Sequence, residues 1–229
     1  MYSRTAILLG AMVLASMPAS AQDFKPLNVT IGGGMTFPNS ELRDHLGDGY
    51  NVNFGLTVNL NSVIGFEGLY SFNGLGEKRI SIPISPTPGA PGVPTDFFGN
   101  MNMQYGTVNL VVRKPEGALR PYLVTGVGVY YRPIQVTTPG IGFVPGYCDP
   151  WWYVCYPGGF VSVENVVGER SSTDFGVDVG GGVTFGTHFF AEARYHYIWG
   201  PTLDTSAVGG SVARKADGQF LPITFGLRF

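Results

Sequence analysis

The last stretch of the chain reads Gln219-Phe-Leu-Pro-Ile-Thr-Phe-Gly-Leu-Arg-Phe229. Large apolar side chains take every second position, and Thr224, Gly226 and Arg228 fall between them. This period of two is typical of a β-strand, because successive side chains point to opposite faces of a pleat. The apolar face keeps a phenylalanine at its very end, so we expect the whole strand to find a partner and to close a sheet into a barrel. The apolar positions are Leu221, Ile223, Phe225, Leu227 and Phe229.

The N-terminal residues carry the parts of a secretory signal peptide in their usual order. Arg4 supplies a positive charge, residues 6–15 form a short apolar run, and residues 19–21 (Ala-Ser-Ala) form a small-x-small cleavage site. We expect residues 1–21 to be a signal peptide and residues 22–229 to be the mature barrel domain. The alternative is a buried N-terminal helix. Because no other apolar run is long enough for a transmembrane helix, the exported chain is either soluble or a barrel in the outer membrane.

The composition favours a single all-β membrane domain. The 229 residues suffice for one such domain. Charged residues make up 13%, against about 25% in soluble proteins, while glycine (34 residues) and aromatic residues (14%) are abundant. The net charge of −2 offers no basic face for nucleic acid.

Seven further segments alternate like the last one. The clearest spans residues 50–60, and its Asn, Thr and Gly residues oppose an aromatic and aliphatic face. The connections are long and short in turn, which predicts an all-β, eight-stranded, antiparallel up-and-down transmembrane barrel with short periplasmic turns and long external loops. In residues 101–113, Met103 and Tyr105 are out of phase with Val108 and Leu110, which leaves room for a β-bulge. The expected strands are 28–36, 50–60, 64–72, 101–113, 119–132, 175–185, 188–199 and 219–229.

The position of the aromatic residues indicates which face meets lipid. They gather at both ends of the strands, as expected for side chains at two water–lipid interfaces. A soluble ligand-binding barrel is the alternative, and it would turn its apolar face inward. The aromatic residues are Tyr50, Tyr70, Phe72, Tyr131, Phe175, Tyr197 and Trp199 at the long-loop end, and Phe185, Phe189 and Phe229 at the short-turn end.

Four segments resemble strands of the small eight-stranded outer-membrane barrels related to OmpA and the opacity proteins. They are Thr107-Val-Asn-Leu-Val-Val-Arg113, Arg120-Pro-Tyr-Leu-Val-Thr-Gly-Val-Gly-Val-Tyr130, Glu192-Ala-Arg-Tyr195 and Phe225-Gly-Leu-Arg-Phe229. The resemblance implies that the last strand, with Phe225, Leu227 and Phe229, is an assembly signal for the barrel assembly machinery. We expect no periplasmic domain after the barrel, and therefore not the anchoring role of the two-domain relatives.

Several charged side chains fall on the polar face of the predicted strands. An eight-stranded interior is only wide enough for its own side chains, which argues against an open diffusion porin. We expect a charge-paired plug, because buried ions must be paired and hydrogen-bonded. A gated ion path or a catalytic group is the alternative. The predicted network consists of Glu67, Asp178, Glu192, Arg194 and His196, with Arg228 on the same face of the last strand.

A further alternative function is an enzyme with its active site at the outer rim of the barrel, since some small outer-membrane barrels modify lipid A. Such an enzyme needs a nucleophile beside a base. His196 stands near that rim, but no serine is placed beside it by short spacing, so we expect His196 to bond to Glu67 or Asp178 instead. His45, Asp44 and Asp48 could bind a metal, although a polar loop of this kind is more often only solvated. We expect neither a metal nor a cofactor.

Two of the long connections carry distinctive residues. Five prolines in residues 80–94 exclude a helix and favour an extended polyproline-like chain. In the third long connection, Cys148 and Cys155 could form a disulfide around a small turn. The residues between them include a row of aromatic side chains, which either form a contact surface or pack on the loop and the lipid. These loop contact candidates are Trp151, Trp152 and Tyr153.

These observations together predict a non-enzymatic outer-membrane protein with a structural or surface-interaction role, such as adhesion, through long extracellular loops. A lipid A-modifying enzyme and a narrow ion channel remain as alternatives. The expected partners are outer-membrane lipid and lipopolysaccharide, the barrel assembly machinery and an extracellular ligand that the sequence does not identify. We expect no nucleic acid partner and a monomeric state.

Overall fold

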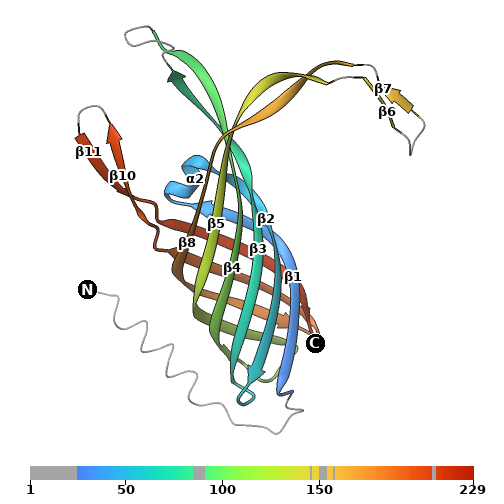
Figure 1. Cartoon of the computed structure of the whole chain (residues 1–229). Coiled ribbons are helices and arrows are strands. Elements are labelled where there is room, and N and C mark those ends of the chain that lie inside the picture. The colour runs from blue at the N-terminus through green and yellow to red at the C-terminus, as the bar shows by residue number, and fades with distance from the viewer. Residues whose placement is uncertain (1–24, 85–90, 145, 150–153, 157, 208–209) are drawn as a thin grey trace.

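The computed structural model describes residues 25–84, 91–144, 146–149, 154–156, 158–207 and 210–229. Eight strands form a closed antiparallel barrel in the order β1-β12-β9-β8-β5-β4-β3-β2 (Figure 1). Neighbours in the ring are also consecutive in the chain, apart from two small inserted hairpins, so the predicted up-and-down topology is confirmed. The barrel strands are β1 (Leu27–Asn39), β2 (Gly47–Asn59), β3 (Ile64–Ile84), β4 (Val93–Arg113), β5 (Leu119–Val144), β8 (Gly159–Phe185), β9 (Phe189–Ile198) and β12 (Gly218–Arg228).

The first and last strands close the ring. β1 and β12 pair antiparallel from Thr30 opposite Arg228 to Asn39 opposite Gln219. The main chain of Phe229 continues this ladder by exchanging two hydrogen bonds with Val29, at 2.9 and 3.1 Å. The last stretch of the sequence therefore closes the barrel, as its alternation predicts. The expected signal peptide, residues 1–21, lies outside the described residues.

The barrel has its apolar residues outside and its polar residues inside. Among the described residues, 22 polar or charged residues are buried, against 13 hydrophobic ones. On β2, Val52, Phe54 and Val58 are about half exposed, whereas Asn51 and Thr57 are buried. The soluble alternative predicts the opposite arrangement and is wrong. Among the described residues, no helix is long and apolar enough to cross a bilayer.

Glycines let the strands and the lumen side chains approach closely. A Cβ atom on Gly34 would overlap the carbonyl oxygen of Ile223 on β12, and one on Gly126 would overlap the side chain of Asn109. Glycine on the inward face therefore leaves room for larger side chains from the opposite strands, as expected for a narrow interior.

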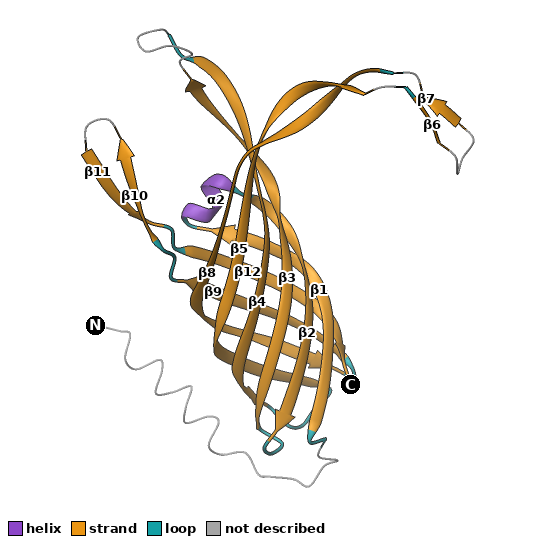
Figure 2. Ribbon diagram, in the orientation of Figure 1, coloured by secondary structure: helices purple, strands orange, loops and turns teal. Residues whose placement is uncertain are grey.

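Two of the expected loops are in fact continuations of the barrel strands. β3 and β4 stay paired out to Ile84 opposite Val93, and β5 and β8 out to Val144 opposite Gly159, so two long hairpins project from the barrel (Figures 1 and 2). The prediction of loops at residues 73–100 and 133–172 is wrong here. The sequence of these segments does not alternate between apolar and polar residues, since a hairpin in water has no single buried face. The polyproline-like expectation is also wrong for Pro83 and Pro94, which face each other in the ladder.

Two smaller elements decorate the same end of the barrel. A short helix, α2 (Glu41–His45), follows β1 and brings the buried Leu46 and partly buried Leu42 to the top of the lumen. A separate hairpin of β10 (Thr202–Ala207) and β11 (Gly210–Lys215) precedes β12. Figure 2 shows both at the end from which the long hairpins project.

The inward phase of β4 is continuous. Met101, Met103, Tyr105, Thr107 and Asn109 are all buried, and β4 pairs with β3 without a register shift from Met101 to Val112. The bulge considered for this strand is therefore absent. The irregularity lies instead on β3, between Leu75 and Lys78. Large apolar side chains point inward at the upper end of β4 because the lumen there is filled by a hydrophobic cluster rather than by ions.

Candidate functional site

The lumen contains a charge cluster centred on Arg194. This guanidinium, on β9, lies between Glu192 on its own strand, Glu67 on β3 and Asp178 on β8. Its Nη2 atom is 2.5 Å from Glu67 Oε1 and 3.0 Å from Glu192 Oε2, and its Nε atom donates to Glu192 Oε1. Asp178 Oδ1 is 3.9 Å from Nη1. Strand alternation brings all four side chains into the interior, where each is at most 5% exposed.

The cluster holds three carboxylates for one guanidinium, so its charges are not balanced pair by pair. Asn109 Nδ2 donates to Glu67 Oε1 at 3.2 Å and relieves part of this excess. Both carboxylate oxygens of Asp178 are buried without a hydrogen-bond partner. This excess of negative charge holds the guanidinium tightly, because its removal would leave three buried carboxylates without their ion-pair partner.

His196 belongs to a separate aromatic layer. Its Nδ1 atom is 2.9 Å from the Tyr130 hydroxyl, and its Nε2 atom is 3.4 Å from the Tyr105 hydroxyl. The imidazole stacks on Phe220 with a centroid distance of 4.5 Å and an interplanar angle of 1°. The expected bond from His196 to Glu67 or Asp178 is therefore wrong. Phe220 fixes the plane of the imidazole so that both ring nitrogens face tyrosine hydroxyls. The nearby carboxylates are bound by Arg194 instead.

Six polar side chains on β1, β2, β3 and β12 form a closed ring of hydrogen bonds. Each hydroxyl in the ring donates one bond and accepts one, and each amide does the same. Such a cycle ties the closing strand of the barrel to its neighbours, and its members strengthen one another in a region of low dielectric constant. The bonds run from Thr36 Oγ1 to Asn73 Oδ1 (2.7 Å), Asn73 Nδ2 to Ser71 Oγ (3.0 Å), Ser71 Oγ to Asn53 Oδ1 (2.5 Å), Asn53 Nδ2 to Thr224 Oγ1 (2.8 Å), Thr224 Oγ1 to Asn51 Oδ1 (3.0 Å) and Asn51 Nδ2 to Thr36 Oγ1 (3.3 Å).

Sequence reasoning missed this ring and one further ion pair. The polar face of each strand is visible in the sequence, but which amide meets which hydroxyl depends on register. Arg132 on β5 and Asp174 on β8 form a buried ion pair of 2.5 Å near the hairpin end, and Arg132 also donates to the carbonyl oxygen of Ala216. Arg132 ends the predicted strand 119–132 in its inward phase, and Asp174 directly precedes the predicted strand 175–185 in phase with its polar face, which was the available signal.

Around the charge cluster the lumen is filled. A cavity beside Arg194, also lined by Glu67, Asn53, Glu192 and Phe190, measures about 10 Å³. That is close to the smallest space that holds one water molecule. Above the charge cluster, the aromatic layer and α2 belong to a continuous buried cluster. Its members are Leu46, Leu69, Leu75, Met101, Met103, Tyr105, Tyr130, Ile198 and Phe220, with Leu42 packed against it.

The three side chains considered as metal ligands in the first loop do not come together in the structure. His45 Nδ1 faces the carbonyl oxygen of Glu41 at 2.9 Å, within α2. Asp44 and Asp48 are exposed. In the described part of the chain, no group of three or more His, Cys, Asp or Glu side chains is placed to hold a metal ion.

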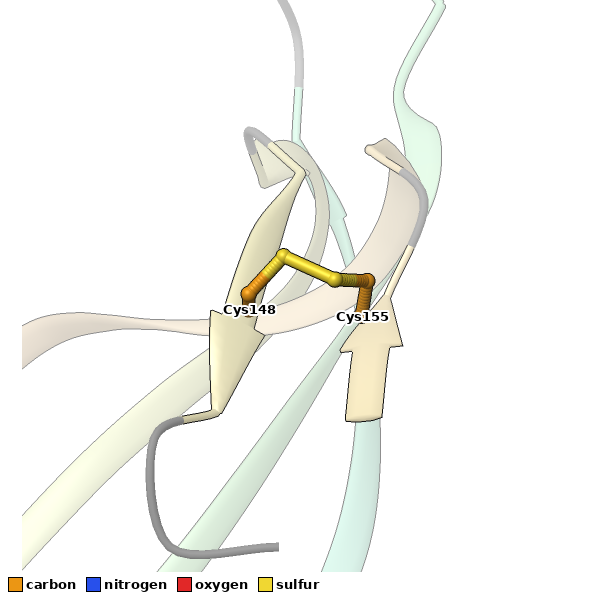
Figure 3. Close-up of a disulfide and its surroundings, with 2 residues drawn as sticks. All are labelled: Cys148 and Cys155. Carbon is orange, nitrogen blue, oxygen red and sulfur yellow. A yellow bond between two sulfur atoms is a disulfide. The ribbon is translucent and has the colours of Figure 1, made fainter. Parts of the chain in front are cut away.

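A disulfide lies near the tip of the β5/β8 hairpin. Two three-residue strands, β6 (Tyr147–Asp149) and β7 (Val154–Tyr156), pair there, and Cys148 is bonded to Cys155 opposite it (Figure 3). The contact candidates Trp151, Trp152 and Tyr153 lie outside the described residues. Nearby on the hairpin, Ile141, Phe143 and Phe160 are more than half exposed.

The β3/β4 hairpin carries a small polar cluster on its surface. Arg79 Nη2 is 2.6 Å from Asp96 Oδ2, and the hydroxyl of Ser81 donates to Asp96 Oδ1. The Ser81 hydrogen bond, followed by the Arg79 contact, lowers the pKa of Asp96 below its usual value.

Residues 6–229 match the family model described as the outer membrane protein beta-barrel domain. The chain belongs to this outer-membrane family. Among solved structures, Ail of Yersinia pestis in complex with the heparin analogue sucrose octasulfate is 11% identical, with 90% of this chain and 100% of Ail covered and a TM-score of 0.45.

Two further solved structures have a similar sequence identity, coverage and TM-score. Neisserial surface protein A is 13% identical, with 89% and 96% of the two chains covered and a TM-score of 0.44. OprG of Pseudomonas aeruginosa is 13% identical, with 92% and 99% covered and a TM-score of 0.44. Among curated proteins, none matches the sequence significantly. As an outer-membrane β-barrel, the chain presents its exposed apolar belt to lipid.

Proposed function

We propose that this protein is a non-enzymatic outer-membrane barrel that holds two stiff β-hairpins outside the cell to bind other surfaces. The observation that carries this is the length of the strands. β8 has 27 residues, of which about 9–11 are needed to cross the hydrocarbon layer. The remainder stays paired with β5 almost to the tip, so the binding tip is carried on a ladder of main-chain hydrogen bonds.

The hairpins offer main-chain and apolar contacts together. β5 pairs with β4 only as far as Thr137, and β8 pairs with β9 only from Gly176 onward. Beyond these points both outer edges of the β5/β8 hairpin are open. An open edge pairs with an extended segment of another chain, and exposed Phe143 and Phe160, 5.5 Å apart, would supply side-chain contacts. A protein partner therefore fits this surface best.

The interior supports a non-transporting, non-enzymatic barrel. The charged cluster, the aromatic layer and the hydrogen-bond ring leave little free volume, which argues against a narrow ion channel. For a lipid A-modifying enzyme, a serine would have to stand beside His196. The inward-facing Ser71 is instead bonded to Asn53 and Asn73 within the ring. We assign the network of Glu67, Asp178, Glu192 and Arg194 the role of a plug.

The remaining assignments follow from this placement. Short turns face the periplasm and hairpins face outward, after export with residues 1–21 as signal peptide. The last strand, with Phe225, Leu227 and Phe229, is recognised by the barrel assembly machinery, and the folded protein is a monomer in contact with lipopolysaccharide. Loss of the aromatic ring in Phe229→Ser should lower the amount of folded barrel in cells, while the purified variant still refolds in detergent.

Replacing residues 138–166 by a short turn tests the binding role. Cells producing this variant should lose adhesion to a panel of immobilised proteins and cultured cells to which the full-length protein adheres. The heat-dependent shift of the band in electrophoresis controls for a folded barrel, because a closed barrel resists detergent until heated. Equal adhesion by the shortened variant would contradict the proposal. An altered lipid A profile on overproduction, or stepwise conductance in planar bilayers, would favour the enzyme or the channel instead.

A further inference from the structure

A basic cavity of about 490 Å³ opens at the short-turn end of the barrel. This end lies opposite the hairpins (Figure 2). Five cationic side chains line it: Lys25, Arg113, Lys114, Arg120 and Arg228. Among the described residues that line this cavity, none is an aspartate or a glutamate. The cavity has no part in the surface binding proposed above.

The topology gathers these cations from distant parts of the sequence. Arg113 ends β4, Arg120 stands near the start of β5, and Arg228 ends β12. Each occupies a position in phase with the inward side chains of its strand, so the three guanidinium groups face the end of the lumen. Lys25 and Lys114 are exposed at the rim of the same opening.

The guanidinium groups keep unused donors. The Nε atoms of Arg113, Arg120 and Arg228 are buried without a hydrogen-bond partner. Arg120 Nη2 donates to the carbonyl oxygen of Gly186 at 2.6 Å, and Arg228 Nη1 donates to Thr184 Oγ1 at 3.3 Å. Buried donors normally find partners, so an anion that drew these side chains toward the opening would supply acceptors that they lack here.

The charges in this cavity repel one another. Arg113, Arg120 and Arg228 line the same cavity, where their like charges repel, while Glu67 attracts Arg113. Glu67 is already bound to Arg194. A multivalent anion in the cavity would relieve this repulsion.

We propose that the cavity binds a dissolved, phosphate-bearing small molecule. The planar donor fork of arginine matches phosphate oxygens, and lysines at the rim add point charges. A volume of about 490 Å³ falls in the usual range for small-molecule sites and exceeds what a bare phosphate needs. The lining side chains face the lumen rather than lipid. A dissolved anion therefore reaches them directly, whereas a lipid headgroup would have to bend over the rim.

Titration of the refolded full-length barrel in zwitterionic detergent with inorganic pyrophosphate tests this site. We expect saturable binding by calorimetry and shifts of the arginine Nε–H signals in NMR spectra. The double variant Arg113→Gln/Arg120→Gln should bind at least about a hundredfold more weakly, since it removes two charged hydrogen-bonding groups from the site. Arg79→Gln, on the outward hairpin, is the matched control and should bind as the unaltered protein does.

Lys25→Gln/Lys114→Gln provides a second test that does not disturb buried residues, and it should also weaken binding. The electrophoretic heat shift verifies that each variant is folded. Absence of saturable binding to the unaltered barrel, or binding by both double variants as tight as that of the unaltered barrel, would overturn the proposal. Nanodiscs with phosphatidylglycerol or phosphatidylcholine separate the two phosphate sources. Arginine signals that respond to the anionic lipid but not to pyrophosphate would exclude the dissolved ligand.

Discussion

Glu67 and Arg194 form an ion pair of 2.5 Å that spans the barrel from side to side. β3 and β9, which carry them, are four strands apart in either direction around the eight-strand ring. Both side chains are at most 4% exposed. The contact therefore acts as a strut between opposite walls, in addition to the hydrogen bonds that join neighbouring strands.

Removing the guanidinium should destabilise the barrel strongly. In Arg194→Met, Glu67, Glu192 and Asp178 would lose the guanidinium that lies within 4 Å of all three of them. We expect the free energy of unfolding to fall by about 3–5 kcal/mol. Urea unfolding in lipid vesicles, followed by tryptophan fluorescence, measures this. Arg79→Gln removes an exposed ion pair of the hairpin and should leave barrel unfolding unchanged. Similar curves for both variants would show that the strut has no role in stability.

The hydrogen-bond ring predicts an effect for a nearly isosteric change. Thr224→Val keeps the shape of the side chain but leaves Asn53 Nδ2 without an acceptor and Asn51 Oδ1 without a donor. A loss of about 1–3 kcal/mol is expected, because each buried group loses its partner. Thr173→Val, at an exposed position of β8, is the control. If the two variants unfold at the same urea concentration, the ring does not stabilise the closing strands.

The disulfide should stabilise the hairpin tip alone. Cys148 and Cys155 are seven residues apart and lie well outside the barrel, so Cys148→Ser/Cys155→Ser removes only a small local loop constraint. Hydrogen–deuterium exchange of residues 147–149 and 154–156 should become faster, while the temperature of the electrophoretic shift stays the same. A lower shift temperature would indicate that the tip and the barrel unfold as one unit.

Acid should release the surface cluster of the β3/β4 hairpin at an unusually low pH. The pKa of Asp96 is lowered in the folded state, so its contacts stabilise the hairpin fully above the ordinary pKa of an aspartate. This contribution is lost only as the pH falls through the lowered pKa. NMR titration of the Asp96 carboxyl carbon measures it. Ser81→Ala removes the main cause and should move the pKa back upward; an unchanged titration would contradict this assignment.

How far the fold could be predicted differs between the barrel and its hairpins. Residues 50–60 show their lipid and lumen faces in the sequence, because the two sides of a membrane strand meet different solvents. Beyond Thr137, most of the described side chains of residues 138–144 and 159–171 are exposed or only partly buried, and neither face packs into the lumen. Their sequence shows no alternation, and pairing that starts in the barrel extends them as strands. Met103 and Tyr105 misled the prediction of strand phase because part of the lumen is apolar.

The sequence by itself determined the number of barrel strands, their order and, apart from the upper end of β4, the face that each barrel residue occupies. These properties depend on local alternation and on the length of each connection. Only the tertiary structure decided which inward side chains meet. Arg194 reaches Glu67 across the lumen while His196 contacts two tyrosines. Ring closure and register set the distances between these residues, which are 66 to 127 positions apart in the sequence. Local pattern cannot encode those distances, since they arise only when the first and last strands pair.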